Sequence, residues 1–468
     1  MFNTVLEKPE KSPLQIDQGK IPEDIEGSLL RIGVGEFSQF DKPTQHWFDG
    51  AGYVINVDFI KGKAFAQWKL IDVQSPVELN SQGPLLGRFG LAPKGLWRRI
   101  SSTWNYDAYL NSANTALLHW QNRLFALYEG SIPTEIDFNS LDTLGPTDLE
   151  VVKRAFSAHP KYHMPTRSYY NFGFRVLPKP CLDIYKLPDE GSPSLLYSIP
   201  YNGCTFMHDF AVSKNFITFF CSPVFAHPWA MLVQGKPLSE CMKFQTQKFS
   251  EVIVIPIQDP ENHFKIKTSP MLFTHTANSY DDDEKITIDG VMYKDGSNLD
   301  WINTAFLGEH QSPTSPGQLH RLEISIDDKS LSSKQLFEEA IEVPQMNLHY
   351  LGQLNHFYYA AGYDKIAEKH EGFYNCIYQL EPHSGQSKQI LGDSKQIFSE
   401  PVFLPRSTQR SEQDGYLAVV HHHLEANTTF LSLLDTYEDS SKVICRLSFE
   451  QPMPFTFHGL WKALSPSG

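Results

Sequence analysis

Short strand-like runs bounded by turn residues recur along almost the whole chain, and this rhythm restricts the possible folds more than any other feature. Residues 251–257, 319–326 and 416–420 are examples, each rich in β-branched or aromatic residues and flanked by Asp, Gly, Pro or Ser. Helical periodicity is weak, and only short stretches such as 107–113 and 147–156 suggest helices. The sequence therefore predicts an all-β protein.

A faint internal repeat refines this prediction. Residues 182–191 and 375–385 share one outline, in which a strand leads to an acidic or proline-containing turn and a glycine starts the returning strand. Residues 319–328 and 431–438 resemble the first half of that outline. Recurring hairpin units are typical of β-propeller blades. No linker or low-complexity segment divides the chain, so we expect residues 1–468 to form one domain.

The charge distribution argues against nucleic acid as a partner. The formal net charge is −14, whereas a nucleic-acid surface needs clustered basic residues that displace counterions. Basic residues gather only at Lys94, Arg98 and Arg99, beside Leu96 and Trp97. Two interpretations stay open for this patch, a solvated loop or a contact with an anionic membrane surface.

The spacing of the cysteines and the hydropathy of the chain indicate the cellular compartment of the protein. The six cysteines show no CxxC pair and no disulfide rhythm, which favours buried thiols in a reducing environment. Residues 1–11 lack the apolar core of a signal peptide. The longest apolar run, 216–226, is far shorter than the roughly 20 residues that a spanning helix needs. We therefore expect a cytoplasmic protein that contacts membranes at most peripherally.

Most of the eighteen histidines must be ordinary polar residues. The adjacent His421, His422 and His423 would alternate between the two faces of a strand and could not converge on one ion, so we interpret them as structural or surface residues. Four other histidines stand in distinctive contexts. These are His159 in Phe-Ser-Ala-His-Pro, His208 in Met-His-Asp-Phe, His275 in His-Thr-Ala-Asn-Ser-Tyr-Asp-Asp, and His458 in Phe-His-Gly-Leu-Trp.

In this order and with these flanks, the four histidines resemble the iron-ligand motifs of carotenoid cleavage oxygenases. The resemblance covers nearly the whole chain, because residues 27–33 and 46–53 are also similar to the family's first strands. One departure is Phe-Asp-Gly-Ala-Gly at 48–52, where the family usually has Phe-Asp-Gly-Asp-Gly.

The resemblance also implies glutamates behind three of the histidines. A carboxylate that accepts the far N–H of a ligating imidazole fixes its tautomer and increases its donor strength. The alternative for each is a solvated turn glutamate. The implied pairs are Glu129 with His208, Glu342 with His275, and Glu400 with His458, which leaves His159 without a carboxylate.

For fold and activity, the resemblance implies a seven-bladed β-propeller with Fe²⁺ on its axis and a cap of loops and short helices over the site. Four neutral imidazoles would leave the ion its full charge and open positions for O₂. The implied reaction cleaves a carbon–carbon double bond of a lipophilic conjugated substrate with O₂, giving aldehyde or ketone products. Thr115 falls where the family often has a threonine near the vacant coordination position, although a buried strand threonine is an equally good interpretation.

The residue before Glu129 indicates which class of substrate the protein prefers. Stilbene-cleaving relatives typically have lysine there, whereas this chain has Tyr128, which favours a carotenoid or apocarotenoid. The resemblance also implies an apolar tunnel that holds the substrate. Candidates for residues that line this tunnel or its mouth, each of which could instead be a core residue, are Trp97, Trp104, Phe206, Phe225 and Trp229. The apolar stretches 83–91 and 223–233 could contact a membrane or be buried.

Three alternatives remain open from the sequence. One is a stilbene double-bond dioxygenase of the lignostilbene type. Another is a retinyl ester isomerohydrolase of the same family, which would consume no O₂. The third is a propeller binding module without catalysis, whose histidines are structural. The sequence does not indicate the oligomeric state.

Overall fold

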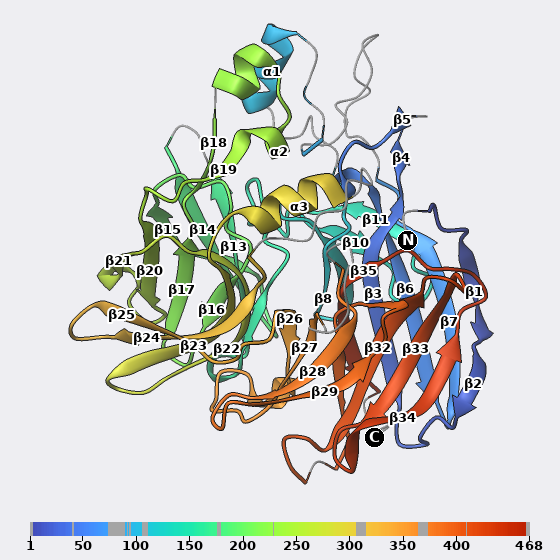
Figure 1. Ribbon diagram of the computed structural model, residues 1–468. Helices are drawn as coiled ribbons and strands as arrows, with labels where there is room; N and C mark the ends of the chain where they lie inside the picture. Colours follow the sequence, from blue (N-terminus) through green and yellow to red (C-terminus); the bar gives the residue numbers. More distant parts are fainter. Residues whose placement is uncertain are drawn as a thin grey trace.

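The computed structural model describes residues 3–39, 42–73, 89–90, 92, 95–104, 111–175, 179–227, 229–305, 315–363, 373–408 and 410–464. Seven antiparallel sheets of four or more strands surround a central axis as the blades of a β-propeller (Figure 1). The predicted all-β, seven-bladed fold is thus confirmed, whereas the single-domain assignment stays a prediction.

Three four-stranded blades follow one another between residues 116 and 268, in the strand orders β8-β9-β10-β11, β12-β13-β14-β15 and β16-β17-β20-β21. Their strands are β8 (Ala116–Trp120), β9 (Arg123–Leu127), β10 (Thr134–Ile136), β11 (Thr143–Pro146), β12 (Lys161–His163), β13 (Ser168–Arg175), β14 (Cys181–Pro188), β15 (Ser194–Pro200), β16 (Phe210–Val212), β17 (Phe216–Cys221), β20 (Ser250–Pro256) and β21 (Phe264–Thr268).

Two further four-stranded blades follow, in the orders β22-β23-β24-β25 and β26-β27-β28-β29. Their strands are β22 (Leu272–Asp281), β23 (Lys285–Tyr293), β24 (Gln318–Ser325), β25 (Ser330–Gln335), β26 (Ile341–Gln345), β27 (Tyr358–Gly362), β28 (Cys376–Glu381) and β29 (Gln386–Gly392). The hairpins expected at 182–191 and 375–385 are the β14–β15 and β28–β29 connections.

The last two blades combine strands from both ends of the chain, which closes the ring. Their orders are β1-β7-β6-β3-β35 and β2-β34-β33-β32-β30, with β31 also paired to β32. The strands are β1 (Lys8–Pro13), β2 (Gln15–Gly19), β3 (Gly27–Glu36), β6 (Ala51–Ile60), β7 (Lys63–Leu70), β30 (Gln396–Phe398), β31 (Val402–Pro405), β32 (Gly415–His423), β33 (Thr428–Asp435), β34 (Asp439–Ser448) and β35 (Thr456–Ala463).

Local sequence explains these hairpins. Lys61 and Gly62 both have positive φ, 48° and 70°, as a two-residue turn between β6 and β7 requires. Apolar strands such as β20 are buried on both faces, because each blade packs between two neighbours. In one such contact, Phe172 of β13 meets Phe210 and Phe219 of the next blade edge to face.

Strands at the inner edges of the blades contact one another around the axis. These contacts join β12 to β16, β16 to β22, β22 to β26, β31 to β35 and β35 to β8. Residues far apart in the sequence therefore meet on the axis when they lie on, or just before, an inner strand.

Short helices gather on one side of the propeller, as Figure 1 shows, and form the expected cap. They are α1 (Leu96–Trp104), α2 (Leu238–Cys241), α3 (Ser297–Ala305) and the π-helical turn η4 (Ala230–Gln234), accompanied by the strand pairs β4 (Ser38–Gln39) with β5 (Lys42–Pro43) and β18 (Val224–Ala226) with β19 (Met242–Phe244). Single 3₁₀ turns are η1 (Trp47–Asp49), η3 (Met164–Thr166), η5 (Pro260–Asn262) and η6 (Leu348–Tyr350). Within the described residues, no helix is long and apolar enough to cross a membrane.

One helix expectation is wrong. Residues 147–156 form turns and irregular chain, because Leu149 and Glu150 adopt left-handed backbone angles with φ of 49° and 62°. Of the stretch 107–113, residues 107–110 lie outside the described part, and 111–113 are not helical. All six cysteines are free and, except for the half-buried Cys181, buried, as expected.

Candidate metal centre

Four histidines converge on the propeller axis. His159 lies two residues before β12, His208 lies two residues before β16, and His275 and His458 are within β22 and β35. One nitrogen of each imidazole lies within 4.8 Å of those of the other three. These are the four histidines predicted from the sequence, and the fold brings them together because each belongs to an inner strand or the residues that lead into it.

The imidazoles turn their Nε2 atoms toward one point. The Nε2 atoms of His159 and His208 are 3.1 Å apart, and those of His208 and His275 are 3.0 Å apart. Ring centroids of His159 and His458 are 4.8 Å apart, with the rings nearly perpendicular at 88°. Nitrogens this close share either a proton or a metal ion, and a set of four cannot all be satisfied by protons among themselves.

The structure brings each implied glutamate to its histidine. Oε2 of Glu342 is 2.6 Å from Nδ1 of His275, and Oε1 of Glu400 is 2.9 Å from Nδ1 of His458. Glu129, just after β9, places Oε1 against Nδ1 of His208. Among the described residues, no carboxylate contacts His159. Carboxylates on Nδ1 leave Nε2 unprotonated and free to donate its lone pair.

All seven blades contribute to this arrangement, one residue each. The histidines come from the blades whose inner strands are β12, β16, β22 and β35, and the glutamates come from the three others. Glu129 follows β9, Glu342 is in β26, and Glu400 lies between β30 and β31.

Glu342 is held by a dense set of donors. Thr274 donates its hydroxyl hydrogen to Oε1 at 2.6 Å, and Tyr293 does so at 2.9 Å. The backbone N–H of Val343 donates to Oε2. Burial would raise the pKa of Glu342, but His275 and these hydrogen bonds lower it to about 2. Glu342 is therefore a carboxylate at neutral pH.

Glu400 has a different set of partners, which includes a cation. Gln345 donates to Oε1 at 2.7 Å, and the backbone N–H of Gly459 donates to Oε2 at 2.7 Å. The guanidinium of Arg31 lies 3.4 Å from Oε2 and donates to the backbone carbonyl of Glu400 at 2.9 Å. Burial raises the pKa of Glu400, but His458 and Arg31 outweigh this effect and lower it. Sequence reasoning missed Gln345 and Arg31.

Asp209 connects three of the four histidine segments. Its Oδ2 accepts from the ammonium of Lys161 at 2.8 Å and from the backbone N–H of Thr276 at 2.7 Å. Lys161 stands two residues after His159, Asp209 follows His208, and Thr276 follows His275. This bridge fixes the spacing of the three histidines. Sequence reasoning quoted Asp209 only as part of the second motif.

The histidine pKa values reflect this asymmetry of partners. Burial, followed by the neighbouring histidines, lowers the pKa of His159 well below its usual value. Burial also lowers the pKa of His458, although Glu400 opposes it. For His208, burial is outweighed by Glu129, and the pKa is raised. His159 is thus neutral at physiological pH, as a metal ligand must be.

Thr115 lies immediately before the inner strand β8 and donates its hydroxyl hydrogen to Oδ1 of Asn114 at 3.0 Å. The amide of Asn114 in turn donates to the backbone carbonyls of Phe48 and Gly50. Thr115 is thus linked to the asparagine that ties this segment to residues 48 and 50, and its proximity to a coordination position stays a prediction. Tyr128, directly before Glu129, is buried.

The candidate mouth residues separate into two groups. Phe206 lies nearly parallel to the ring of His208, 6.0 Å between centroids, and Phe225 carries the ammonium of Lys248 over its ring. Trp97 and Trp229 are 82% and 60% exposed, so for them the core interpretation is wrong. The Trp104 side chain lies outside the described residues, as do residues 83–88 and 91 of the first apolar stretch.

The triplet 421–423 is structural, as expected. His421 and His422 are buried in β32 and hydrogen-bond to Ser432 and Thr429 on β33. Neither belongs to the histidine cluster on the axis. Burial lowers the pKa of His421 to about 3 and that of His422 to about 4.

Acid is therefore expected to destabilise the fold through these two buried histidines. Between pH 6.5 and their folded pKa values the unfolded chain binds more protons, so stability falls as pH falls, by up to about 1.4 kcal/mol per pH unit for each histidine. Urea unfolding at pH 7.5 and 5.5 measures this, and His421→Phe should reduce the difference between the two midpoints. An unchanged difference would show that His421 is already protonated in the folded state.

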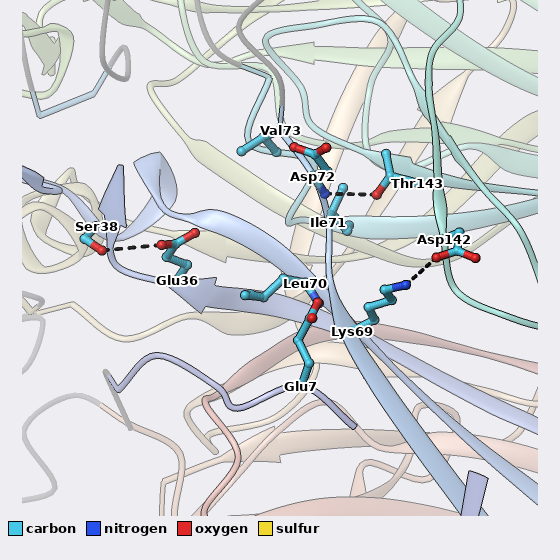
Figure 2. Close-up of a pocket in the computed structure, with 10 residues that line it drawn as sticks. All are labelled: Glu7, Glu36, Ser38, Lys69, Leu70, Ile71, Asp72, Val73, Asp142 and Thr143. Carbon is cyan, nitrogen blue, oxygen red and sulfur yellow. Dashed lines mark hydrogen bonds and ion pairs between the residues drawn. The ribbon is translucent and has the colours of Figure 1, made fainter. Parts of the chain in front are cut away.

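A separate surface cleft of about 650 Å³ lies along the end of β7 (Figure 2). Its polar groups are bonded to one another, for example Lys69 to Asp142 and the backbone N–H of Asp72 to Thr143. None of the four histidines lines it. Figure 2 shows these bonds among the residues that line the cleft.

Comparisons with known proteins place the chain in a family. The family described as retinal pigment epithelial membrane protein matches residues 1–463. Apocarotenoid-15,15'-oxygenase of Synechocystis sp. is 26% identical, over 95% of this chain and 92% of its own. Carotenoid 9,10(9',10')-cleavage dioxygenase 1 of Pisum sativum is 26% identical, over 95% and 85%. Isoeugenol monooxygenase of Pseudomonas nitroreducens is 24% identical, over 96% and 94%.

Solved structures agree on the fold. The cobalt-substituted apocarotenoid oxygenase of Synechocystis superimposes with a TM-score of 0.84 at 24% identity, covering 98% of this chain and 97% of that one. The histidine cluster described above fits a metal site. Since the family match extends over nearly every residue and the propeller agrees with it, this chain belongs to the carotenoid cleavage oxygenase family.

Proposed function

We propose that this protein is a mononuclear iron(II) dioxygenase that cleaves a carbon–carbon double bond of a carotenoid or apocarotenoid with O₂, giving two carbonyl products. The observation that carries the proposal is the axial cluster, in which four imidazole nitrogens lie within 4.8 Å of one another and three of the rings are backed by glutamates. The named relatives, which include apocarotenoid and carotenoid cleavage enzymes, support the reaction type.

The donor geometry supports iron over a closed zinc site. Two nitrogens that each lie about 2.1 Å from one ion are about 3.0 Å apart at a right angle, and about 3.4 Å apart in a tetrahedron. The Nε2 separations of 3.0 and 3.1 Å fit the right angle. Ligands at right angles would leave positions open on the ion, and imidazole is a ligand that suits iron. His159, His208, His275 and His458 would hold the ion.

When bound, Fe²⁺ would supply O₂ activation beside the alkene. The chain's own residues prepare the site for this chemistry. Glu342 and Glu400 keep the Nδ1 protons of His275 and His458 in place, so that both rings present lone pairs to the axis. Phe206, parallel to His208, provides an apolar surface next to the metal ligands, which suits a hydrocarbon substrate.

Tyr128 supports an apocarotenoid or carotenoid substrate, because a buried aromatic residue offers no ammonium to a phenol. The isoeugenol monooxygenases among the relatives make a small phenolic alkene the competing candidate. Incubating the iron-loaded protein with apocarotenals, hydroxystilbenes and isoeugenol distinguishes them. We expect shortened aldehydes from the apocarotenals. Cleavage of only the phenolic alkenes would overturn the substrate assignment, and a protein that binds no iron would overturn the proposed function.

We also propose that the cap contacts a membrane at its outer end. Trp97 and Leu96 on α1 are exposed, and α1 packs against η4, where Val233 and the preceding Trp229 are exposed too. Arg99 of α1 donates to the backbone carbonyl of Val233 on η4. Figure 1 shows α1 at the outer end of the cap. An apolar patch with cations beside it is typical of binding to anionic lipid surfaces.

The variant Trp97→Ser/Trp229→Ser should therefore bind anionic vesicles at least about tenfold more weakly, because two indole rings leave the lipid boundary. Cosedimentation with phosphatidylserine vesicles measures this. Turnover of substrate dissolved in detergent should stay unchanged. The exposed Leu348 on η6 offers a matched control, Leu348→Ser. Equal vesicle binding by all three proteins would contradict the membrane assignment.

A further inference from the structure

Arg31 is a wholly buried arginine beside the metal centre, with 1% of its surface exposed. It lies in β3, in a run of residues that are otherwise apolar or small. Its Nε and Nη2 donate to Oγ1 of Thr456 at 3.2 and 3.1 Å, and Nη1 donates to the carbonyl of Glu400. Gly459 leaves room for it, since a Cβ there would lie 2.7 Å from Cδ and Nη1 of Arg31. The guanidinium is thus held in one position.

Arg31 is also distinctive among the partners of the three glutamates. Glu342 is bonded by the neutral donors Thr274 and Tyr293 and by a backbone N–H, besides His275. Among the described residues, Arg31 is the one cation, apart from the histidines, that contacts any of the three glutamates. Burial lowers the pKa of Arg31, while Glu400 and Tyr53 oppose this. Because a guanidinium does not deprotonate in proteins, Arg31 keeps its charge.

The charges around the four histidines balance only when Arg31 is included. Glu129, Glu342 and Glu400 carry three negative charges, and the imidazoles of a metal-loaded cluster are neutral. A divalent ion supplies two positive charges and Arg31 supplies the third. The neighbouring pair of Lys161 and Asp209 compensates itself. The centre is therefore neutral with a divalent ion and carries one net positive charge with a trivalent ion.

We propose that Arg31 is a positioning residue that acts through charge, holding the bound iron in its divalent state. The inference rests on the proposed function. Removing one electron from a bound Fe²⁺, by dioxygen or by an added oxidant, would give the centre one further positive charge, which buried surroundings stabilise poorly. One unit charge at roughly 8 Å, with an effective dielectric constant of about 20, changes the ratio of ferric to ferrous iron by about thirtyfold.

Variants at two positions separate charge from structure. Arg31→Gln leaves the divalent centre with a net negative charge, so the ferric form should be favoured by about thirtyfold. Glu400→Gln removes a negative charge and should shift the ratio in the opposite direction. The double variant Arg31→Gln/Glu400→Gln restores the balance and should return toward the wild-type ratio, and Arg31→Lys should stay near it. Arg175→Gln is the matched control, because Arg175 pairs with Asp183 and none of the site residues.

The experiment is an anaerobic redox titration of the iron-loaded proteins, which follows the ferric electron paramagnetic resonance signal. Iron content per chain is measured first. Opposite shifts for the two single variants, with recovery in the double variant, are expected. Shifts of one sign, or none, would overturn the role of Arg31. If Arg31→Gln does not fold, Glu400→Gln and the double variant decide, because they must differ from each other. A wild-type protein without iron would instead overturn the proposed function.

Discussion

Replacing His275 with alanine is expected to abolish metal retention and activity while leaving the propeller folded. His275 supplies one of four converging nitrogens, and its loss also leaves Glu342 without its histidine partner in a buried position. Removing a group that only orients a metal ligand typically costs 10–100-fold in metal affinity, so loss of the ligand itself should cost more than about 100-fold. Metal content per chain after dialysis and turnover of an apocarotenal measure the two effects.

His421→Ala is the matched control for this variant. His421 is also a buried strand histidine with a hydrogen-bonded ring, but it lies on β32 and outside the cluster. We expect it to lose stability and to keep its iron and its turnover per iron. Full activity of a His275→Ala protein that holds no iron would refute the assignment of the axial cluster as the active site.

Glu342→Gln is expected to lower metal affinity and turnover by about 10–100-fold without eliminating either. Glutamine keeps the shape of the side chain, but it removes the charge that draws the Nδ1 proton of His275 and holds the ring's tautomer. Thr274 and Tyr293 already share Oε1, so the amide nitrogen would replace Oε2 and face the N–H groups of His275 and Val343 as a further donor. The optical spectrum of the Co²⁺-substituted protein should change as well, since cobalt bands report ligand strength and angle.

A buried glutamate away from the axis provides the comparison. Glu412 accepts hydrogen bonds from the backbone N–H groups of His356 and Phe357 and touches none of the four histidines. Glu412→Gln should lower the unfolding midpoint and leave the cobalt spectrum and turnover unchanged. Identical effects of the two substitutions on cobalt spectra would show that Glu342 acts only through general stability.

The fold and the main residues of the site could be predicted because they leave local marks in the sequence. Hairpins repeat the strand, turn and glycine outline, so residues 182–191 indicate the β14–β15 hairpin without reference to neighbouring strands. The histidines occur in motifs whose order and flanks resemble one family. Glu342 and Glu400 could be assigned to His275 and His458 from the same resemblance, and the structure brings both pairs into contact.

Other features depend on tertiary contacts that leave no local mark. Arg31 and Gln345 meet Glu400 from β3 and β26, strands that are far apart in the sequence, so only the closed ring shows their role. The single visible sign was that Arg31 stands among the apolar and small residues of β3. The exposure of Trp97 was missed for a related reason, since composition indicates aromatic residues but not which of them the blades cover. The helix expected at 147–156 failed because two left-handed residues interrupt it.

The central claim is that iron on the propeller axis uses O₂ to cleave a double bond. Its most direct test is mass spectrometry of the products formed by protein of known iron content from an apocarotenal and ¹⁸O₂, with rapid reduction of the aldehydes to prevent exchange with water. We predict two shortened carbonyl products, both carrying ¹⁸O, in amounts that scale with bound iron. Products formed equally well without O₂, or unlabelled products from protein holding one iron per chain, would contradict the account.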